Sequence, residues 1–363
     1  MRIAILAPLV TPIREPQRGG SQSFVADLAA GLTARGHEVH VYAATGSDIA
    51  GVTVVDTGIE PEALRDSLYR AGTPGRGDAG PADAAFAHVY ALARKRSYDL
   101  VHNHAFDAPA IRFATALEAP VVHTLHLPPE RSVAGALEAA RLSDRPPTVA
   151  AVSASQARAW RGLTRIDVVL PNGVPVSRIP WSDAPGSGLV FAGRLSWEKG
   201  AAEALDIAMA AGVRIDLYGD PYDVAYAEER VYTRRRHPEV AIHSAVERSV
   251  LWERMARAAA VVCPARWEEP FGLVAAEAQA AGTPVVAFRR GGLEEVIVDG
   301  LTGFLVAPDD VSAAAQAVGR VACIRRAACR RHAAARLGLE SSLDAHEELY
   351  RQLTQSKEAA TRA

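Results

Sequence analysis

Short apolar runs alternate along the chain with longer amphipathic segments, and the alternation begins at the first residues. Residues 2–9 and 38–43 have the continuous apolar character of buried strands, and residues 21–35 between them have the period of a helix. Further strands are predicted at residues 100–104, 119–125, 148–152 and 167–171. Alternation of this kind predicts parallel sheets covered by helices on both faces.

The same alternation starts again at residue 188. Strands are predicted at residues 188–192, 213–218, 240–243, 259–263 and 283–288, and helices at residues 201–211, 251–258 and 274–281. Gly282 followed by Pro284 marks the end of the last of these helices. Two domain-sized halves of the same α/β class therefore follow one another.

A change in amino-acid composition indicates where the boundary between these halves lies. A segment rich in Pro, Gly and Ser predicts a linker at residues 176–187, between a first Rossmann-like domain at 1–175 and a second at 188–335. Residues 336–363 are expected to form a helical tail that packs back toward the first domain. Residues 71–83 (AGTPGRGDAGPAD) are predicted to form an exposed loop.

Charge and composition narrow the class of partner. The net charge of −2 over 363 residues creates no general attraction for nucleic acid or for an anionic membrane. No apolar stretch reaches the ~18 residues of a membrane span, and the apolar start is too short for a signal peptide. The three cysteines form no CxxC motif. We expect a cytoplasmic protein with small-molecule partners, no nucleic acid and no stable membrane association; the sequence leaves its oligomeric state open.

A basic cluster, RLSWEKG, directly follows the first strand of the second half. Ligands of open parallel sheets bind outside the carboxyl ends of the strands. Arg194 offers a planar fork and Lys199 a point charge, and both suit a diphosphate. Only three of the 40 basic residues are lysines, which makes Lys199 more noticeable. The alternative is that both are solvated side chains in a surface loop.

A second cluster runs from Glu269 to Glu277 (EPFGLVAAE). Pro270 suits the first turn of a helix, and Gly272 permits close approach of a ligand to the backbone. The backbone N–H groups expected to face an anion there are those of Phe271, Gly272, Leu273 and Val274. The two glutamates would lie roughly 12 Å apart along the helix, beyond the ~5–9.5 Å of glycosidase carboxylate pairs. They therefore suit the two ends of a long ligand, unless they are simply exposed helix acids.

Two weaker signals lie in the first half. Gly19 and Gly20 precede the first helix and could admit phosphates, although a plain turn is the alternative. Four histidines end two successive strands: His102, His104, His123 and His126. They lack a carboxylate or cysteine at ligand spacing, so we expect one or two of them to line a cleft and the others to pack. No G-x-G-x-x-G follows the first strand, which counts against a dinucleotide dehydrogenase. The chain contains no Asp-x-Asp, which favours diphosphate binding by Arg and Lys without a metal.

Taken together and in order, these motifs resemble the retaining glycosyltransferases of family 4. The matching segments are Gly19-Gly20, VHNH at 101–104, HTLH at 123–126, AVSAS at 151–155, PNGV at 171–174, AGRLSWEKG at 192–200, the two glutamates of 269–277, AAGTPVVA at 280–287, GG-x-x-E at 291–295 and DGLTGFLV at 299–306. The resemblance covers about residues 1–310 and implies the GT-B architecture, two Rossmann-like domains whose parallel sheets face one another across a cleft.

The resemblance also implies an activity, namely retaining transfer of a sugar from a nucleotide-diphosphate sugar, most often a UDP-sugar, to a small soluble acceptor hydroxyl, without metal or cofactor. Arg194 and Lys199 would then hold the phosphates and stabilise the departing diphosphate. Glu277 would bind the ribose, and Glu269 with the backbone of 271–274 would meet the sugar and the phosphates. Gly19 and Gly20 would close on the phosphates, and His126 would position or polarise the sugar.

The chain departs from the family pattern at two places. Pro175 follows Asn-Gly-Val where an acidic residue is usual, and Trp267-Glu268 is bulkier than the common pair before Glu269, which could reshape the sugar pocket. The Arg- and Ala-rich composition suits a tailoring enzyme of antibiotic or other secondary-metabolite biosynthesis. Two alternatives stay open: a nucleotide-sugar epimerase of related fold, and a catalytically silent protein that binds sugar nucleotides.

Overall fold

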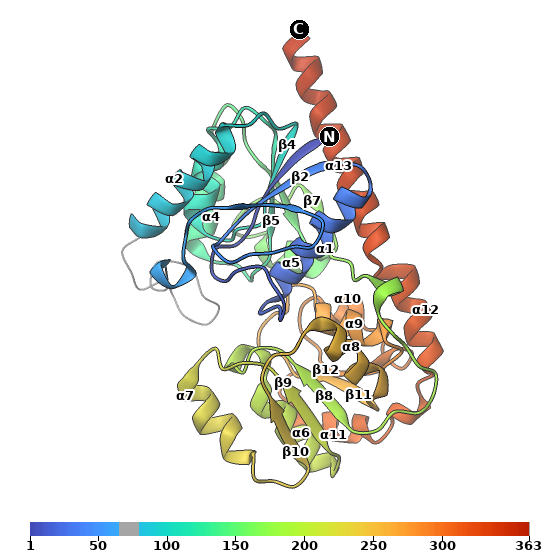
Figure 1. The fold of residues 1–363 in the computed structure, drawn as a ribbon. Helices are drawn as coiled ribbons and strands as arrows, with labels where there is room; N and C mark the ends of the chain where they lie inside the picture. Colours follow the sequence, from blue (N-terminus) through green and yellow to red (C-terminus); the bar gives the residue numbers. More distant parts are fainter. Residues whose placement is uncertain (65–79, 363) are drawn as a thin grey trace. The chain divides into compact units, whose positions relative to one another are not determined.

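The computed structural model describes residues 1–64 and 80–362, and contacts divide the chain into two compact units (Figure 1). The first unit comprises Met1–Arg14, Ser21–Pro171 and Glu340–Ala363, and the second comprises Glu15–Gly20 and Asn172–Leu339. Residues 176–187, predicted as a linker, pack within the second unit, where Arg326 Nε donates to the Ser182 carbonyl at 2.8 Å. Of the predicted loop 71–83, residues 71–79 lie outside the described residues, and a helix begins at Gly80.

The first unit contains a seven-stranded sheet in which all pairings are parallel. The spatial order is β3-β2-β1-β4-β5-β6-β7. The strands are β1 (Arg2–Leu6), β2 (Glu38–Ala43), β3 (Thr53–Asp56), β4 (Leu100–Asn103), β5 (Val121–Leu125), β6 (Thr148–Ala151) and β7 (Val168–Val169). The direction in which strands are added reverses between β1 and β4, where Ile5 pairs with His102.

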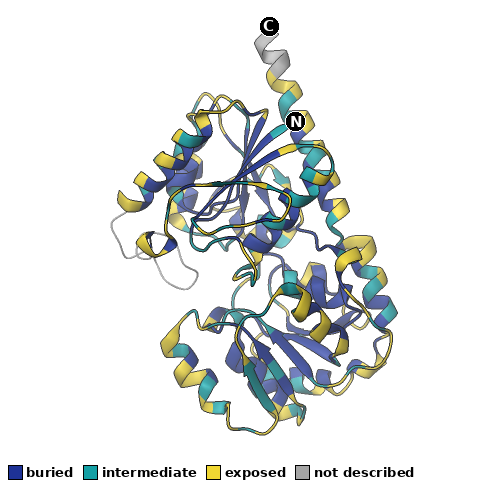
Figure 2. Cartoon of the chain, viewed as in Figure 1, coloured by how far each residue is buried: buried dark blue, intermediate teal, exposed yellow. Residues whose placement is uncertain are grey.

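Helices cover both faces of this sheet. They are α1 (Gly20–Ala34), α2 (Gly80–Arg94), α3 (Ala108–Ala114), α4 (Arg131–Arg141), α5 (Ala154–Trp160) and α13 (Leu339–Arg362), with a 3₁₀ turn at Pro61–Leu64. Strand residues such as Leu6 and Val101 pack with Phe86 and Tyr90 of α2 in one apolar cluster. Figure 2 shows the resulting burial of the central strands. On another side, a Cβ at Gly31 of α1 would lie 2.6 Å from Leu343 of α13, so the glycine permits the two helices to pack closely.

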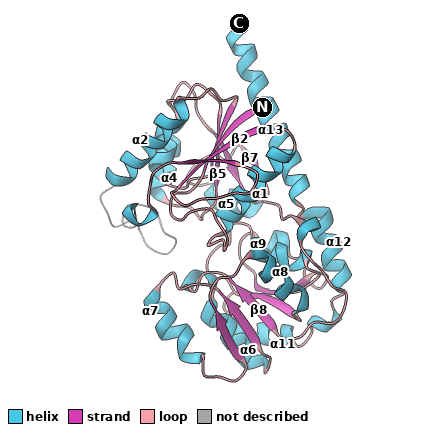
Figure 3. Cartoon of the chain, in the orientation of Figure 1, coloured by secondary structure: helices cyan, strands magenta, loops and turns pink. Residues whose placement is uncertain are grey.

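The second unit contains a six-stranded parallel sheet in the order β10-β9-β8-β11-β12-β13. Figure 3 draws this sheet in magenta around the label β8. Its strands are β8 (Leu189–Ala192), β9 (Ile215–Tyr218), β10 (Val240–His243), β11 (Ala260–Cys263), β12 (Val285–Phe288) and β13 (Gly303–Val306). Its helices are α6 (Ala201–Ala211), α7 (Val224–Tyr226), α8 (Arg248–Arg257), α9 (Leu273–Ala280), α10 (Leu293–Val296), α11 (Val311–Val318) and α12 (Arg326–Arg336).

Short helical turns complete the second unit: 3₁₀ turns at Val176–Arg178, Trp197–Lys199, Tyr232–Arg234 and Val321–Cys323, and a π-helical turn at Ala227–Val231. The predicted class of two α/β Rossmann-like units with parallel sheets is confirmed. Among the residues described, no helix combines the length and the apolar character that crossing a membrane requires.

A cluster of charged side chains attaches α13 to the rest of the first unit. The Arg35 guanidinium lies 2.6 Å from Glu340, 2.7 Å from Asp344 and 2.6 Å from Glu347. His37 Nε2 contacts the other oxygen of Glu347 at 2.7 Å. The hydrogen bond from His37, followed by that from Arg35, holds the pKa of the Glu347 carboxyl below its usual value. Arg35 is thus the centre of the polar attachment of α13.

We predict that Arg35→Ala lowers the melting temperature of the first unit by a few degrees, because a partly exposed ion-pair cluster contributes about 1 kcal/mol. The Glu347 pKa is lowered in the folded state, so its contribution is present above the unfolded pKa and is lost as the pH falls through the folded pKa. The difference between variant and wild type should therefore shrink as the pH falls below 4.5. Calorimetric melting against pH measures both effects. Arg351→Ala, which removes an exposed pair with Glu348 on α13, is the control, and an equal shift in both variants would contradict the prediction.

Candidate functional site

Two loops of the second unit come together at the carboxyl ends of neighbouring strands. β8 and β11 are adjacent, and the direction of strand addition reverses between them, which is where open α/β sheets bind ligands. The loop after β8 leads to Lys199, and the loop after β11 leads to α9. The backbone N–H of Arg266 donates to the Glu198 carbonyl at 2.9 Å and ties the loops together. At Gly200, with φ 72°, a Cβ would lie 1.9 Å from the Pro264 carbonyl oxygen, so only glycine allows this approach.

Lys199 and Glu269 form an ion pair between these loops. Lys199 Nζ lies 2.7 Å from Glu269 Oε2, and the indole N–H of Trp267 donates to the same oxygen at 2.8 Å. The ammonium also lies 4.6 Å from the centre of the Trp267 ring. The exposed fractions of the Lys199 and Glu269 side chains are 24% and 15%, so a ligand can reach the pair. The structure thus brings together two of the predicted site residues.

Arg194 is held at the start of the same region. Its guanidinium lies 4.4 Å above the ring centre of Tyr222, and Nη2 lies 3.0 Å from Glu198 Oε1. The contact with Glu198 is an ion pair without hydrogen-bond alignment. Tyr222 and Glu198 therefore hold the fork of Arg194 in one orientation. Tyr222 lies outside the motifs noted in the sequence, and Glu198 lies within the RLSWEKG cluster but was given no role there.

The N-terminus of α9 provides backbone donors beside this ion pair. The helix begins at Leu273, and its N-cap Gly272 adopts φ 101° and makes no side-chain cap. The N–H groups of a first helical turn have no partner within the helix, and the helix dipole adds partial positive charge. Gly292 supports the segment before α9, since a Cβ there would lie 2.7 Å from Phe271 Cα. Phe271 itself is buried, and the side chains of Leu273 and Val274 are half-buried.

Glu277, at the far end of the predicted pair, is buried in α9 and is held by a residue that sequence reasoning missed. Arg248 Nη2 lies 2.9 Å from Glu277 Oε1, and the Arg248 guanidinium lies 4.8 Å from the Trp252 ring centre. Arg248 is the first residue of α8 and lies 29 positions before Glu277. No local spacing links the two residues, so no signal in the sequence could have found this pair.

Gly19 and Gly20 belong to the short segment Glu15–Gly20, which groups with the second unit. A Cβ at Gly20 would lie 3.3 Å from Leu273 Cδ1, at the first residue of α9. Gly20 therefore lies beside the first residue of α9, where the predicted backbone donors also lie.

The histidines belong to the first unit, and two of them are hydrogen-bonded to each other. His104 Nδ1 lies 2.8 Å from His126 Nε2, and His102 Nε2 lies 2.7 Å from the Thr124 hydroxyl. Burial, followed by His123 and His346, lowers the pKa of His126 to about 3. His126 is 7% exposed, whereas His102 and His104 are fully buried. His126 is thus a neutral imidazole at neutral pH, and His102 and His104 are packing residues.

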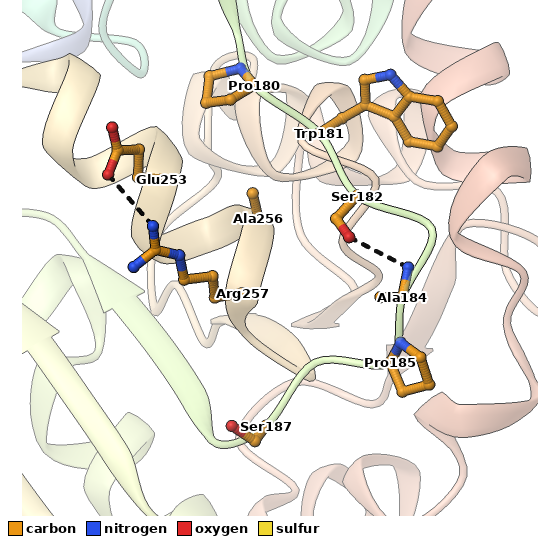
Figure 4. Close-up of a pocket in the computed structure, with 9 residues that line it drawn as sticks. All are labelled: Pro180, Trp181, Ser182, Ala184, Pro185, Ser187, Glu253, Ala256 and Arg257. Atoms are coloured by element: carbon orange, nitrogen blue, oxygen red, sulfur yellow. Dashed lines mark hydrogen bonds and ion pairs between the residues drawn. The ribbon is translucent and has the colours of Figure 1, made fainter.

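Two further features bear on ligands. In the described part of the chain, no three His, Cys, Asp or Glu side chains gather as a candidate metal site. Figure 4 shows a surface cavity of about 370 Å³ whose lining, Pro180, Trp181, Ser182, Ala184, Pro185, Ser187, Glu253, Ala256 and Arg257, includes none of the predicted site residues. A second cavity of about 350 Å³, between β13 and α11, also includes none of them.

Comparison with known proteins gives a consistent result. The family model described as "Glycosyltransferase Family 4" matches residues 18–178, and "Glycosyl transferases group 1" matches residues 186–334. A D-inositol 3-phosphate glycosyltransferase from Xylanimonas cellulosilytica is 30% identical, with 88% of this chain and 87% of that protein covered.

Solved structures agree with these matches. A glycosyltransferase involved in avilamycin A biosynthesis is 26% identical, with a TM-score of 0.72 and 98% of each chain covered. HepE from Anabaena, solved in complex with UDP and glucose, is 21% identical, with a TM-score of 0.75 and coverage of 96% of this chain and 99% of that one. With two family models over its two halves and a relative over most of its length, the chain belongs to the family 4 glycosyltransferases of GT-B fold.

Proposed function

We propose that this glycosyltransferase moves a sugar, with retention of configuration and without a metal ion, from a UDP-sugar to a hydroxyl of a small soluble acceptor. The observation that carries the proposal is the grouping of Lys199, Glu269 and the N-terminus of α9 at one strand-order reversal. The cation and the unpaired backbone N–H groups suit the diphosphate of a nucleotide sugar, and the carboxylate suits its hydroxyl groups.

The diphosphate is bound by exchange of partners. Lys199 is paired with Glu269 and Arg194 with Glu198, so the charge of each cation is compensated. An incoming diphosphate offers several charged oxygens to both cations and to the N–H groups of α9. Because the cations are already oriented, little reorganisation is needed when further negative charge develops on the leaving group.

The hydroxyl groups of the donor fit the two glutamates. Ionised carboxylates accept hydrogen bonds, and Glu269 lies beside Lys199, whereas Glu277 lies along α9. Glu269 therefore serves the transferred sugar, and Glu277 serves the ribose. The structure of HepE contains UDP, and this supports uracil as the base.

The reaction follows from these contacts. The bond between the anomeric carbon and the β-phosphate oxygen breaks first, and both electrons remain with the phosphate. The acceptor oxygen then forms its bond on the same face of the sugar, and the departing phosphate takes the hydroxyl proton. Configuration is thus retained without a protein nucleophile. Lys199 and Arg194 stabilise the charge that the diphosphate gains, and neutral His126 positions or polarises the sugar.

We further propose that the acceptor is a small metabolite of an antibiotic or related secondary pathway. The similarity to the avilamycin A glycosyltransferase over 98% of both chains supports this choice. The relative from Xylanimonas cellulosilytica, by its name, acts on an inositol phosphate, which is also a small polar acceptor.

We predict that Lys199→Ala lowers turnover by about two orders of magnitude, since one such contact to developing charge contributes ~2.7–4 kcal/mol. Steady-state kinetics with a saturating donor measure the effect. Lys95→Ala, which removes an exposed lysine of the first unit, is the control and should leave turnover unchanged. Wild-type turnover in Lys199→Ala would contradict the assignment of the site.

Titration calorimetry against UDP, GDP and ADP, with EDTA present, should show micromolar binding of UDP that weakens in Lys199→Ala. Binding of none of the three would contradict nucleotide-sugar transfer. Binding that occurs with no later release of UDP from any UDP-sugar would identify a silent binding protein instead.

We also expect EDTA to leave the rate of transfer nearly unchanged and the product to keep the anomeric configuration of the donor. Proton NMR of the reaction measures the rate from the growth of the product signals and the configuration from the coupling constant of the anomeric proton. Loss of activity with EDTA that added Mg²⁺ restores would contradict the metal-free proposal, and an inverted product would contradict the same-face mechanism.

A further inference from the structure

Trp267 makes two contacts with the ion pair at the centre of the site. It lies in the loop between β11 and α9, two residues before Glu269. Its indole N–H donates to Glu269 Oε2 at 2.8 Å, and its ring lies 4.6 Å from Lys199 Nζ. One side chain thus touches both charged members of the pair.

The two oxygens of Glu269 have different surroundings. Oε2 accepts from both Lys199 and Trp267. Oε1 accepts no hydrogen bond from the residues that the structure describes, and it is not one of the buried side-chain atoms that lack a partner. Oε1 is therefore open to solvent. An ionised carboxylate can accept at both oxygens. Oε1 is therefore the oxygen that remains for a ligand.

The sharing of Glu269 Oε2 by Lys199 and Trp267 has a consequence when a nucleotide sugar binds. A diphosphate attracts the Lys199 ammonium, and Glu269 then loses one of its two donors. A carboxylate that is only 15% exposed is destabilised when it is left without donors. The indole N–H is a neutral donor with no acceptor function. The negative charge of the diphosphate therefore attracts Trp267 much less than it attracts the Lys199 ammonium. The Trp267 hydrogen bond can therefore persist through the exchange.

We propose that Trp267 is a positioning residue for sugar recognition: its indole N–H holds Glu269 by Oε2, keeps that carboxylate in place when Lys199 turns to the diphosphate, and leaves Oε1 for the hydroxyls of the transferred sugar. This inference rests on the proposed function. It separates the recognition of the sugar from that of the nucleotide, because Trp267 acts on the sugar only through Glu269.

The experiment compares wild type with Trp267→Phe, which keeps an aromatic face for Lys199 and removes the N–H. Calorimetry measures the affinity for UDP alone and for a UDP-sugar, and kinetics measure KM and kcat. We expect the affinity for the UDP-sugar to fall about tenfold, as for a hydrogen bond to a charged group. The affinity for UDP should stay unchanged. Trp181→Phe is the matched control, because Trp181 is 45% exposed and lines the cavity of Figure 4.

A spectroscopic measurement tests the hydrogen bond itself. The indole ¹H–¹⁵N signal that disappears in Trp267→Phe belongs to Trp267. It should lie downfield in the wild type and move upfield in Glu269→Gln, where the acceptor loses its charge. It should remain downfield when UDP is added. An upfield signal in the free protein, or one that does not respond to Glu269→Gln, would overturn the proposal.

The outcomes separate the two proposals. If UDP binds and Trp267→Phe weakens UDP and UDP-sugar equally, or weakens neither, then Trp267 has no part in sugar recognition and the inference fails. If the wild type binds no nucleoside diphosphate, the proposed function fails instead, and the indole signal alone then decides whether Trp267 holds Glu269. A lower melting temperature with an unchanged ratio of the two affinities would indicate a purely structural role and overturn the inference.

Discussion

The ion pair between Lys199 and Glu269 is the interaction on which the second unit's site depends. It joins two loops that are 70 residues apart in sequence, and it exists because β8 and β11 lie next to each other in the sheet. Both side chains are partly exposed, so solvent screens their attraction and the pair can open at modest cost. The pair thus holds the Lys199 ammonium and the Glu269 carboxylate in place between the two loops, and each charge is compensated by the other.

Much of the fold follows from local pattern. The bounds of β2, α6 and β10 coincide with those expected from apolar periodicity, and most other strands begin or end within a few residues of the expected positions. β3 and β13 were not predicted as strands. β3 has only half-buried and exposed positions, and β13 begins with Gly303 in a Gly-rich segment, so neither has the continuous apolar run that marks a buried strand.

The site could be predicted only in part. Lys199, Glu269 and the start of α9 were expected to meet one donor because of the resemblance to family 4, and the structure brings Lys199 and Glu269 together. Arg248 with Glu277 could not be expected, since side-chain pairing between α8 and α9 depends on how the two helices pack. The histidines show the same limit, because only the burial of the cluster reveals that His126 is neutral.

The chain forms its first unit from both ends. Residues up to Pro171 build the sheet, and the segment from Glu340 onward returns to it through α13 and the Arg35 cluster. The second unit lies almost entirely between these stretches. During synthesis on the ribosome, the sheet of the second unit can therefore be complete while one face of the first still lacks α13. The surface of α1 around Gly31 therefore stays exposed to solvent until α13 has emerged and packed against it.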